Sequence, residues 1–225
     1  MRNLYLVAKN SLLRNKGKNE MGVINVLNNL LYIKEKQVPF LANPVKKYSD
    51  GVNTCQYIIM HYTGSTTAKS AHNQYLDPKT QVSWHLTIDR DGNVTQLLGF
   101  DKIAWHAGKS SWGKGGGLIN GLNGHSIGIE HSNAGPLSEK NGAYVTWSGQ
   151  TIPNSDVFFD AHGNPWQAYS PNQLKASKFL TVELAKILKV KDILSHEMIS
   201  PGRKSDTGPA FQATLNDIRK TYLNG

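Results

Sequence analysis

Short apolar runs bounded by turn residues alternate with segments of helical periodicity from residue 56 onward, and this alternation limits the possible folds more than any other feature of the sequence. The runs have the length of strands and span residues 57–60, 83–88, 94–98, 102–105 and 126–130. The turn sequence Asp91-Gly92 predicts that the second and third runs pair as a hairpin. A chain with this pattern is expected to form a layered α/β domain.

Three segments carry helix signals between or after these runs. One spans about residues 67–75, and a longer one begins with Ser170 and Pro171, where Gln173 completes a capping box. A last helix is expected after Pro209. Because a chain of 225 residues can bury about 70% of its unfolded surface in one core, we expect a single catalytic domain in which helices flank a central, mostly covered, mixed β-sheet.

Residues 1–50 differ in character from the rest, with nine basic and three acidic residues in a chain whose net charge is +9. Asn19 is a candidate helix cap, and apolar residues follow it at three- and four-residue spacing. These residues are Val23, Val26, Leu27, Leu30 and Leu31. We therefore predict that residues 1–50 form a basic segment with an amphipathic helix and a linker, and that residues 51–225 form the catalytic domain. The apolar stripe fits a helix packed on that domain as well as a membrane-active helix.

The basic excess in residues 1–50 favours attraction to a polyanion, and we expect contact with an anionic envelope or membrane rather than with nucleic acid. A solvated basic face without a partner is the alternative. No apolar run approaches the roughly 18 residues that span a bilayer. Lys9 interrupts the first apolar stretch short of the ~7 apolar residues of a signal peptide, so we expect no cleaved export signal. We also expect the protein to be a monomer.

Histidines and carboxylates are the candidate metal ligands, because the single cysteine, Cys55, excludes both an intrachain disulfide and a multi-cysteine zinc site. His61 directly follows the first apolar run, at the strand end that delivers side chains into a cleft. His196 opens a Pro- and Gly-containing loop that reaches Asp206. Two imidazoles and a carboxylate suffice for a catalytic zinc ion with one open position.

A general base and a cation would complete such a site. Glu130 ends an apolar run and is a candidate base, although a paired surface carboxylate would look the same in the sequence. Lys204 lies two residues before Asp206 and is a candidate for stabilising an oxyanion, although it could simply balance the charge of that aspartate.

Five separated motifs in order carry a resemblance to a known family. They cover residues 59–63, 82–88, 104–108, 126–130 and 196–211, with the sequences IMHYT, VSWHLTI, AWHAG, SIGIE and HEMISPGRKSDTGPAF. Together they resemble the zinc-dependent N-acetylmuramoyl-L-alanine amidases of the peptidoglycan recognition protein superfamily, and most of all a phage lysis amidase, or endolysin. The resemblance covers roughly residues 56–212.

The resemblance implies one Zn²⁺ ion held by His61, His196 and Asp206. Water activated by the metal with help from Glu130 would attack the lactyl carbonyl that joins N-acetylmuramic acid to L-alanine in peptidoglycan, while Lys204 stabilises the oxyanion. The residues expected to contact substrate are Trp84, His85, His106 and Arg203. For His85 and His106, structural support of the cleft is the alternative role.

Departures from the family pattern are also visible. Thr207 stands where the family usually has proline, and Trp84 replaces a smaller residue, which would reshape the rim for stacking. We do not expect His131 to be a ligand, because adjacent strand residues point to opposite faces. The insertion 132–169 contains Trp147 and Trp166, which form part of the groove wall or pack in a core.

The resemblance leaves the setting open. A lysis enzyme would accumulate in the host cytoplasm and act on the cell wall, in the periplasm, after the membrane fails. A cytosolic recycling amidase would act on soluble muropeptides instead. Relatives that bind peptidoglycan without cutting it typically lack the complete ligand set, which this sequence retains.

Overall fold

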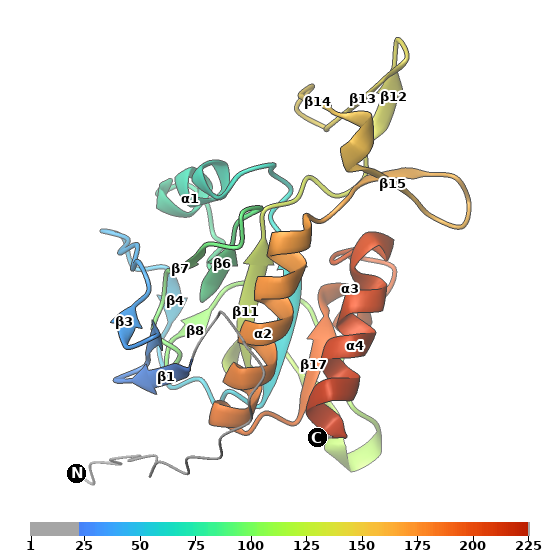
Figure 1. Cartoon of the computed structure of the whole chain (residues 1–225). Coiled ribbons are helices and arrows are strands. Elements are labelled where there is room, and N and C mark those ends of the chain that lie inside the picture. The colour runs from blue at the N-terminus through green and yellow to red at the C-terminus, as the bar shows by residue number, and fades with distance from the viewer. Residues whose placement is uncertain (1–22, 225) are drawn as a thin grey trace, which may run out of the picture.

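The computed structural model describes residues 23–224, and a five-stranded mixed sheet forms its centre (Figure 1). The strands are β5 (Tyr57–Tyr62), β6 (Leu86–Ile88), β7 (Val94–Gln96), β11 (Ser126–His131) and β17 (Asp192–Ser195). Their order is β17-β5-β11-β6-β7, with the first four parallel and β7 antiparallel to β6. This confirms the predicted mixed sheet and the predicted hairpin between β6 and β7.

Two helices cover one face of the sheet. The helices are α1 (Ala68–Leu76), α2 (Pro171–Leu188), α3 (His196–Ile199) and α4 (Gln212–Leu223). Of these, α1 and α3 pack in other clusters of buried residues. The capping signals act as expected, because the Thr67 hydroxyl accepts from the Ser70 amide at α1 and the Ser170 hydroxyl accepts from the Gln173 amide at α2. In Figure 1, α2 and α4 lie side by side over the sheet, and their apolar residues form the main core with the buried strands.

Short elements cover part of the opposite face. They are β8 (Ile103–Ala104), β9 (Ser111–Trp112), β10 (Ile119–Asn120) and the 3-10 helices η1 (Gly115–Gly117) and η2 (Leu122–His125). Leu122 and Ala107 pack there against Ile59 and Leu194 of the central strands. The predicted run at 102–105 is β8, which pairs with β4 (Tyr48–Ser49) and not with the central sheet.

The predicted N-terminal amphipathic helix is wrong for the described residues. Residues 24–37 instead form an antiparallel sheet of β1 (Ile24–Leu27), β2 (Leu30–Ile33) and β3 (Lys36–Gln37). Asn28 and Asn29 have φ of 51° and 64°, the positive values that a two-residue type I′ turn requires and that asparagine tolerates. The expected cap, Asn19, lies outside the described residues.

The sheet formed by β1, β2 and β3 packs into the main core. Ile24, Leu31 and Val38 are buried in the same cluster as Ile58 and Leu180. Residues 24–38 therefore pack as part of the domain, and the described part of the predicted basic segment is not a separate appendage.

The insertion 132–169 projects from the domain beside the carboxyl ends of the central strands (Figure 1). It consists of β12 (Ser138–Lys140), β13 (Ala143–Val145), β14 (Thr151–Ile152), η3 (Asn154–Asp156), β15 (Val157–Phe159) and β16 (Pro165–Gln167). An ion pair of 2.8 Å between Arg90 and Asp156 ties it to the β6–β7 turn. Within residues 23–224, every helix is too short or too polar to cross a membrane.

Candidate metal centre and catalytic cavity

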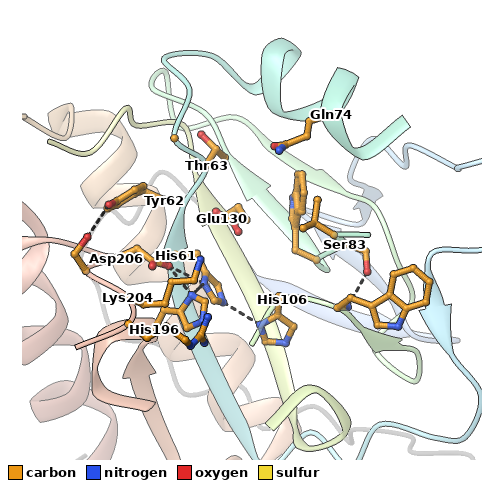
Figure 2. A pocket seen from close by; sticks show the side chains of 16 residues that line it. His61, Tyr62, Thr63, Gln74, Ser83, His106, Glu130, His196, Lys204 and Asp206 are labelled. Atoms are coloured by element: carbon orange, nitrogen blue, oxygen red, sulfur yellow. Dashed lines mark hydrogen bonds and ion pairs between the residues drawn. The ribbon is translucent and has the colours of Figure 1, made fainter. Parts of the chain in front are cut away.

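The strand register brings the predicted site residues together at one edge of the sheet. Glu130 on β11 lies directly opposite His61 on β5, and Ser195 on β17 lies opposite Met60. His196, the residue after Ser195, therefore stands on the other side of His61. Because these strands are parallel, their carboxyl ends meet at one edge, and the three side chains line one cavity (Figure 2).

His61, His196 and Asp206 converge on a common point. The two Nδ1 atoms lie 3.0 Å apart, and each lies 2.9 Å from Oδ2 of Asp206. All three residues are buried. Ligand atoms about 2.0–2.2 Å from a tetrahedral ion lie roughly 3.3 Å apart, so this triangle has nearly the size of one face of a tetrahedral zinc coordination shell. The donor set fits a divalent metal ion.

A chain of hydrogen bonds sets the tautomer of His61. The Ser126 hydroxyl donates to the Leu122 carbonyl, 2.7 Å away, so its oxygen accepts from Nε2 of His106 at 3.2 Å. Nδ1 of His106 is then an acceptor, and Nε2 of His61 donates to it at 2.9 Å. Nδ1 of His61 is left with its lone pair directed at His196 and Asp206, as a metal ligand requires.

His196 is oriented in a similar way. Its Nε2 lies 3.1 Å from the Ala107 carbonyl, to which it donates, so Nδ1 keeps its lone pair. Arg203 supports the same loop, because its Nη2 donates to the Ser200 hydroxyl at 2.7 Å and to the Lys109 carbonyl at 2.8 Å. Arg203 lines the cavity, and its contact with substrate stays a prediction. The hydrogen bonds above also make it a link between two loops.

Burial and the contacts between them shift the pKa values of His61 and Asp206. Burial lowers the pKa of His61 to about 4, with the neighbouring Asp206 opposing this effect. Burial alone would raise the pKa of Asp206, but the close contacts of its carboxylate with His196 and His61 hold it well below its usual value. A neutral His61 and an ionised Asp206 at neutral pH are the forms that bind a metal ion.

Glu130 is poised as an acid–base group. Burial raises the pKa of its carboxyl well above the usual value, the charge of Asp206 adds to the effect, and Lys204 opposes it. Its Oε2 atom is buried and has no hydrogen-bond partner among residues 23–224. Because a buried carboxyl oxygen without a partner is costly, this atom is available for a water or substrate proton.

The cavity has a volume of about 410 Å³. Of the predicted site residues it is lined by His61, Trp84, His106, Glu130, His196, Arg203, Lys204 and Asp206. The cavity is also lined by Tyr62, Thr63, Gln74 and Ser205, which are not among the predicted site residues. The Tyr62 and Ser205 hydroxyls lie 3.0 Å apart and join the two ligand-bearing segments across the cavity. The position of Tyr62 and Thr63 directly after His61 was the signal available for those two.

His85 is the predicted substrate contact that the structure contradicts. Its ring is fully buried, Nδ1 accepts from the Gly128 amide at 3.0 Å, and Nε2 donates to the Lys102 carbonyl at 3.0 Å. Nδ1 thus ties the start of β6 to β11, Nε2 bonds to the residue before β8, and the side chain does not line the cavity. Of the two roles considered, structural support is the one that fits.

Trp84 and His131 are also buried. Trp84 is 4% exposed, and its indole nitrogen donates to Thr87 at 2.7 Å, so the ring forms cavity wall and its stacking on substrate stays a prediction. His131 points to the opposite face, as expected. Its Nδ1 donates to the His61 carbonyl at 2.8 Å and its Nε2 accepts from Ser177 of α2.

The fold and the site together define an α/β domain with three convergent candidate metal ligands and, in the same cavity, a buried glutamate and a lysine. Residues 51–209 match the model of the family Amidase_2, described as N-acetylmuramoyl-L-alanine amidase. The chain belongs to this family.

Curated relatives match over shorter stretches. The chain is 30% identical over 131 residues to the 1,6-anhydro-N-acetylmuramyl-L-alanine amidase AmpD of Escherichia coli (strain K12), which is 58% of this chain and 54% of AmpD. It is 41% identical over 78 residues to the N-acetylmuramoyl-L-alanine amidase XlyA of Bacillus subtilis (strain 168), which is 33% of this chain and 23% of XlyA. The chain thus spans about half the length of AmpD and about a quarter of XlyA.

Solved structures share the fold. A selenomethionine derivative of AmpD superposes with a TM-score of 0.53 at 22% identity, covering 86% of this chain and 98% of AmpD. The amidase AmiD from E. coli superposes with a TM-score of 0.55 at 24% identity, covering 77% and 60% of the two chains. That structure is a complex with the substrate anhydro-N-acetylmuramic acid-L-Ala-D-γ-Glu-L-Lys.

Proposed function

We propose that this protein is a zinc-dependent amidase that hydrolyses the amide between N-acetylmuramic acid and L-alanine in peptidoglycan. The observation that carries the proposal is the buried convergence of His61, His196 and Asp206 in the cavity that also holds Glu130 and Lys204. Family membership supports the choice of bond. The muropeptide bound to AmiD supports the substrate class, because that protein shares this fold.

Each residue of the cavity has a role in this reaction. His61, His196 and Asp206 would hold one zinc ion, which when bound lowers the pKa of a water ligand to about 7 and polarises a carbonyl. Glu130 takes a proton from the attacking water and returns it to the leaving nitrogen, so that the C–N bond breaks and L-alanine leaves as an amine. The Lys204 ammonium stabilises the oxyanion of the tetrahedral intermediate.

For the setting, we propose lysis of the cell wall by an endolysin-like enzyme, held in the host cytoplasm until lysis, with the bacteriolytic effect that follows. The excess of nine basic over three acidic residues in residues 1–50 supports contact of this segment with the anionic envelope. We also propose that the protein acts as a monomer. A recycling amidase is the second candidate, favoured by the 30% identity to AmpD over 131 residues.

The test compares two substrates for the release of new L-alanine amino groups: intact peptidoglycan sacculi and soluble anhydro-muropeptides. A lysis enzyme is expected to cleave the sacculi at least as fast as the soluble substrate. Cleavage of the soluble substrate alone would support recycling. Binding to sacculi with no amine released from either substrate, in zinc-supplied protein, would contradict the amidase proposal and leave a recognition module.

A further inference from the structure

Trp147 is a large aromatic residue in an unusual position. It is 81% exposed, the highest fraction among the large hydrophobic side chains of residues 23–224. It lies in the turn that follows β13, on the projecting insertion. Its indole nitrogen donates to the Gly64 carbonyl at 2.7 Å, and Gly64 lines the catalytic cavity. The exposed ring therefore extends the edge of that cavity.

The turn that carries Trp147 is held in place from both sides. Within the turn, the Thr146 amide donates to the Gln150 carbonyl at 2.9 Å, and the Thr146 hydroxyl accepts from the Gln150 amide at 3.1 Å. Outside it, the Thr66 hydroxyl donates to the Gln150 side chain at 2.8 Å. Because the indole is tied by one edge while most of its surface remains in solvent, a ligand could pack on the ring without first ordering it.

The two segments that the Trp147–Gly64 hydrogen bond joins carry no charged side chain. Residues 143–152 and residues 62–67 contain no Asp, Glu, Lys or Arg, whereas they offer hydroxyl and amide groups on both sides of the Trp147–Gly64 hydrogen bond. A pyranose ring presents C–H groups that pack on an aromatic surface, and its hydroxyl and acetamido groups bond to side chains of this kind. A stem peptide carries carboxylates, and the cavity places its cations, Arg203 and Lys204, on a different loop.

We propose that Trp147 is a platform for an N-acetylated sugar of the glycan strand, so that the enzyme holds the polymer at the edge of the catalytic cavity. This inference rests on the proposed function, because it takes peptidoglycan as the substrate. It assigns the insertion a role in recognising glycan rather than peptide, and it makes the exposed indole a specificity determinant.

The test measures binding to three probes: glycan strands stripped of their stem peptides, free stem peptide, and intact sacculi. Trp147→Ala is expected to weaken binding to the stripped glycan about tenfold, the effect of losing one apolar stacking contact, and to leave binding to the free peptide unchanged. Trp147→Phe, which keeps an aromatic ring, is expected to retain most of the affinity. Val52→Ala is the matched control, because Val52 is also highly exposed and lies outside the cavity.

Melting curves of all four proteins establish that the variants are folded. The proposal is overturned if Trp147→Ala binds the stripped glycan like the parent protein, or if the parent protein does not bind that glycan. It is also overturned if Trp147→Ala loses binding to the free stem peptide and keeps binding to the glycan. Because the stripped glycan lacks the amide to L-alanine that the enzyme is proposed to cleave, this result does not depend on catalysis. Failure of the parent protein to release amines from sacculi would count separately, against the proposed function.

Discussion

The chain of hydrogen bonds behind His61 predicts that a residue remote from the metal controls metal affinity. Ser126→Ala removes the hydroxyl that donates to Leu122 and accepts from His106. Without that acceptor, the His106 tautomer with its proton on Nε2 is no longer favoured. A proton on Nδ1 of His106 would oppose the hydrogen bond that His61 donates. His61 then no longer presents a fixed lone pair to the metal.

The magnitude follows from the position of Ser126 in the chain. Loss of an outer partner of a metal ligand typically costs about 10–100-fold in metal affinity. Because Ser126 acts through His106, we expect the lower end for Ser126→Ala, about tenfold, and the upper end, about 100-fold, for His106→Leu. Ser126→Ala also leaves the buried Leu122 carbonyl without this donor, which costs about 1–3 kcal/mol of unfolding free energy.

The assay is competition for zinc against a chromogenic chelator, with unfolding curves recorded in parallel. Ser177→Ala is the matched control, because Ser177 is also a fully buried serine bonded to a histidine, at 2.9 Å, on the opposite face of the sheet. It should lose comparable stability but keep the zinc affinity of the parent protein. Unchanged zinc affinity in Ser126→Ala, or an equal loss in both variants, would refute the reasoning.

Three further predictions concern separate features of the site. Glu130→Gln is expected to lower the rate of amine release by about 10²–10⁴ while zinc, measured by metal analysis, stays bound; loss of zinc would contradict a role limited to acid–base chemistry. Gly128→Ala places a Cβ 2.7 Å from the His106 ring, so both the melting temperature and the zinc affinity should fall, and a variant equal to the parent in both would count against the packing described. Burial lowers the pKa of His85 to about 4, so between pH 6.5 and about pH 4 this histidine is mostly protonated in the unfolded chain and mostly neutral in the folded chain. His85 therefore lowers the free energy of unfolding by about 2 kcal/mol at pH 5. Urea unfolding at pH 7 and pH 5 should show that the loss of stability between these pH values is smaller in His85→Asn than in the parent protein by about this amount.

The central strands and the metal site could be predicted because several signals agree there. The apolar runs at 57–60 and 126–130 are buried on both faces of a parallel sheet, and each ends in a polar residue, His61 or Glu130. Parallel strands place such residues at one edge whatever the loops between them do. The opposite orientation of His131 follows from the same strand geometry.

Other parts depend on contacts that the sequence does not display. The spacing of apolar residues from 24 to 31 suits a helix, but it suits a hairpin equally once Asn28 and Asn29 adopt positive φ. His85 sits in a family motif, yet the backbone groups of Gly128 and Lys102 occupy both its nitrogens. Long-range pairing of this kind is settled by tertiary packing rather than by local pattern.

The most direct test of the account measures metal content and amine release on one preparation. The protein is stripped with a chelator, reconstituted with zinc in steps, and assayed at each step on purified peptidoglycan. The account predicts that amine release disappears on stripping and returns in proportion to zinc, reaching its maximum at one ion per chain, and that His196→Ala neither retains zinc nor recovers activity. Amine release that persists in the stripped protein, or zinc binding that survives the loss of His196, would contradict it.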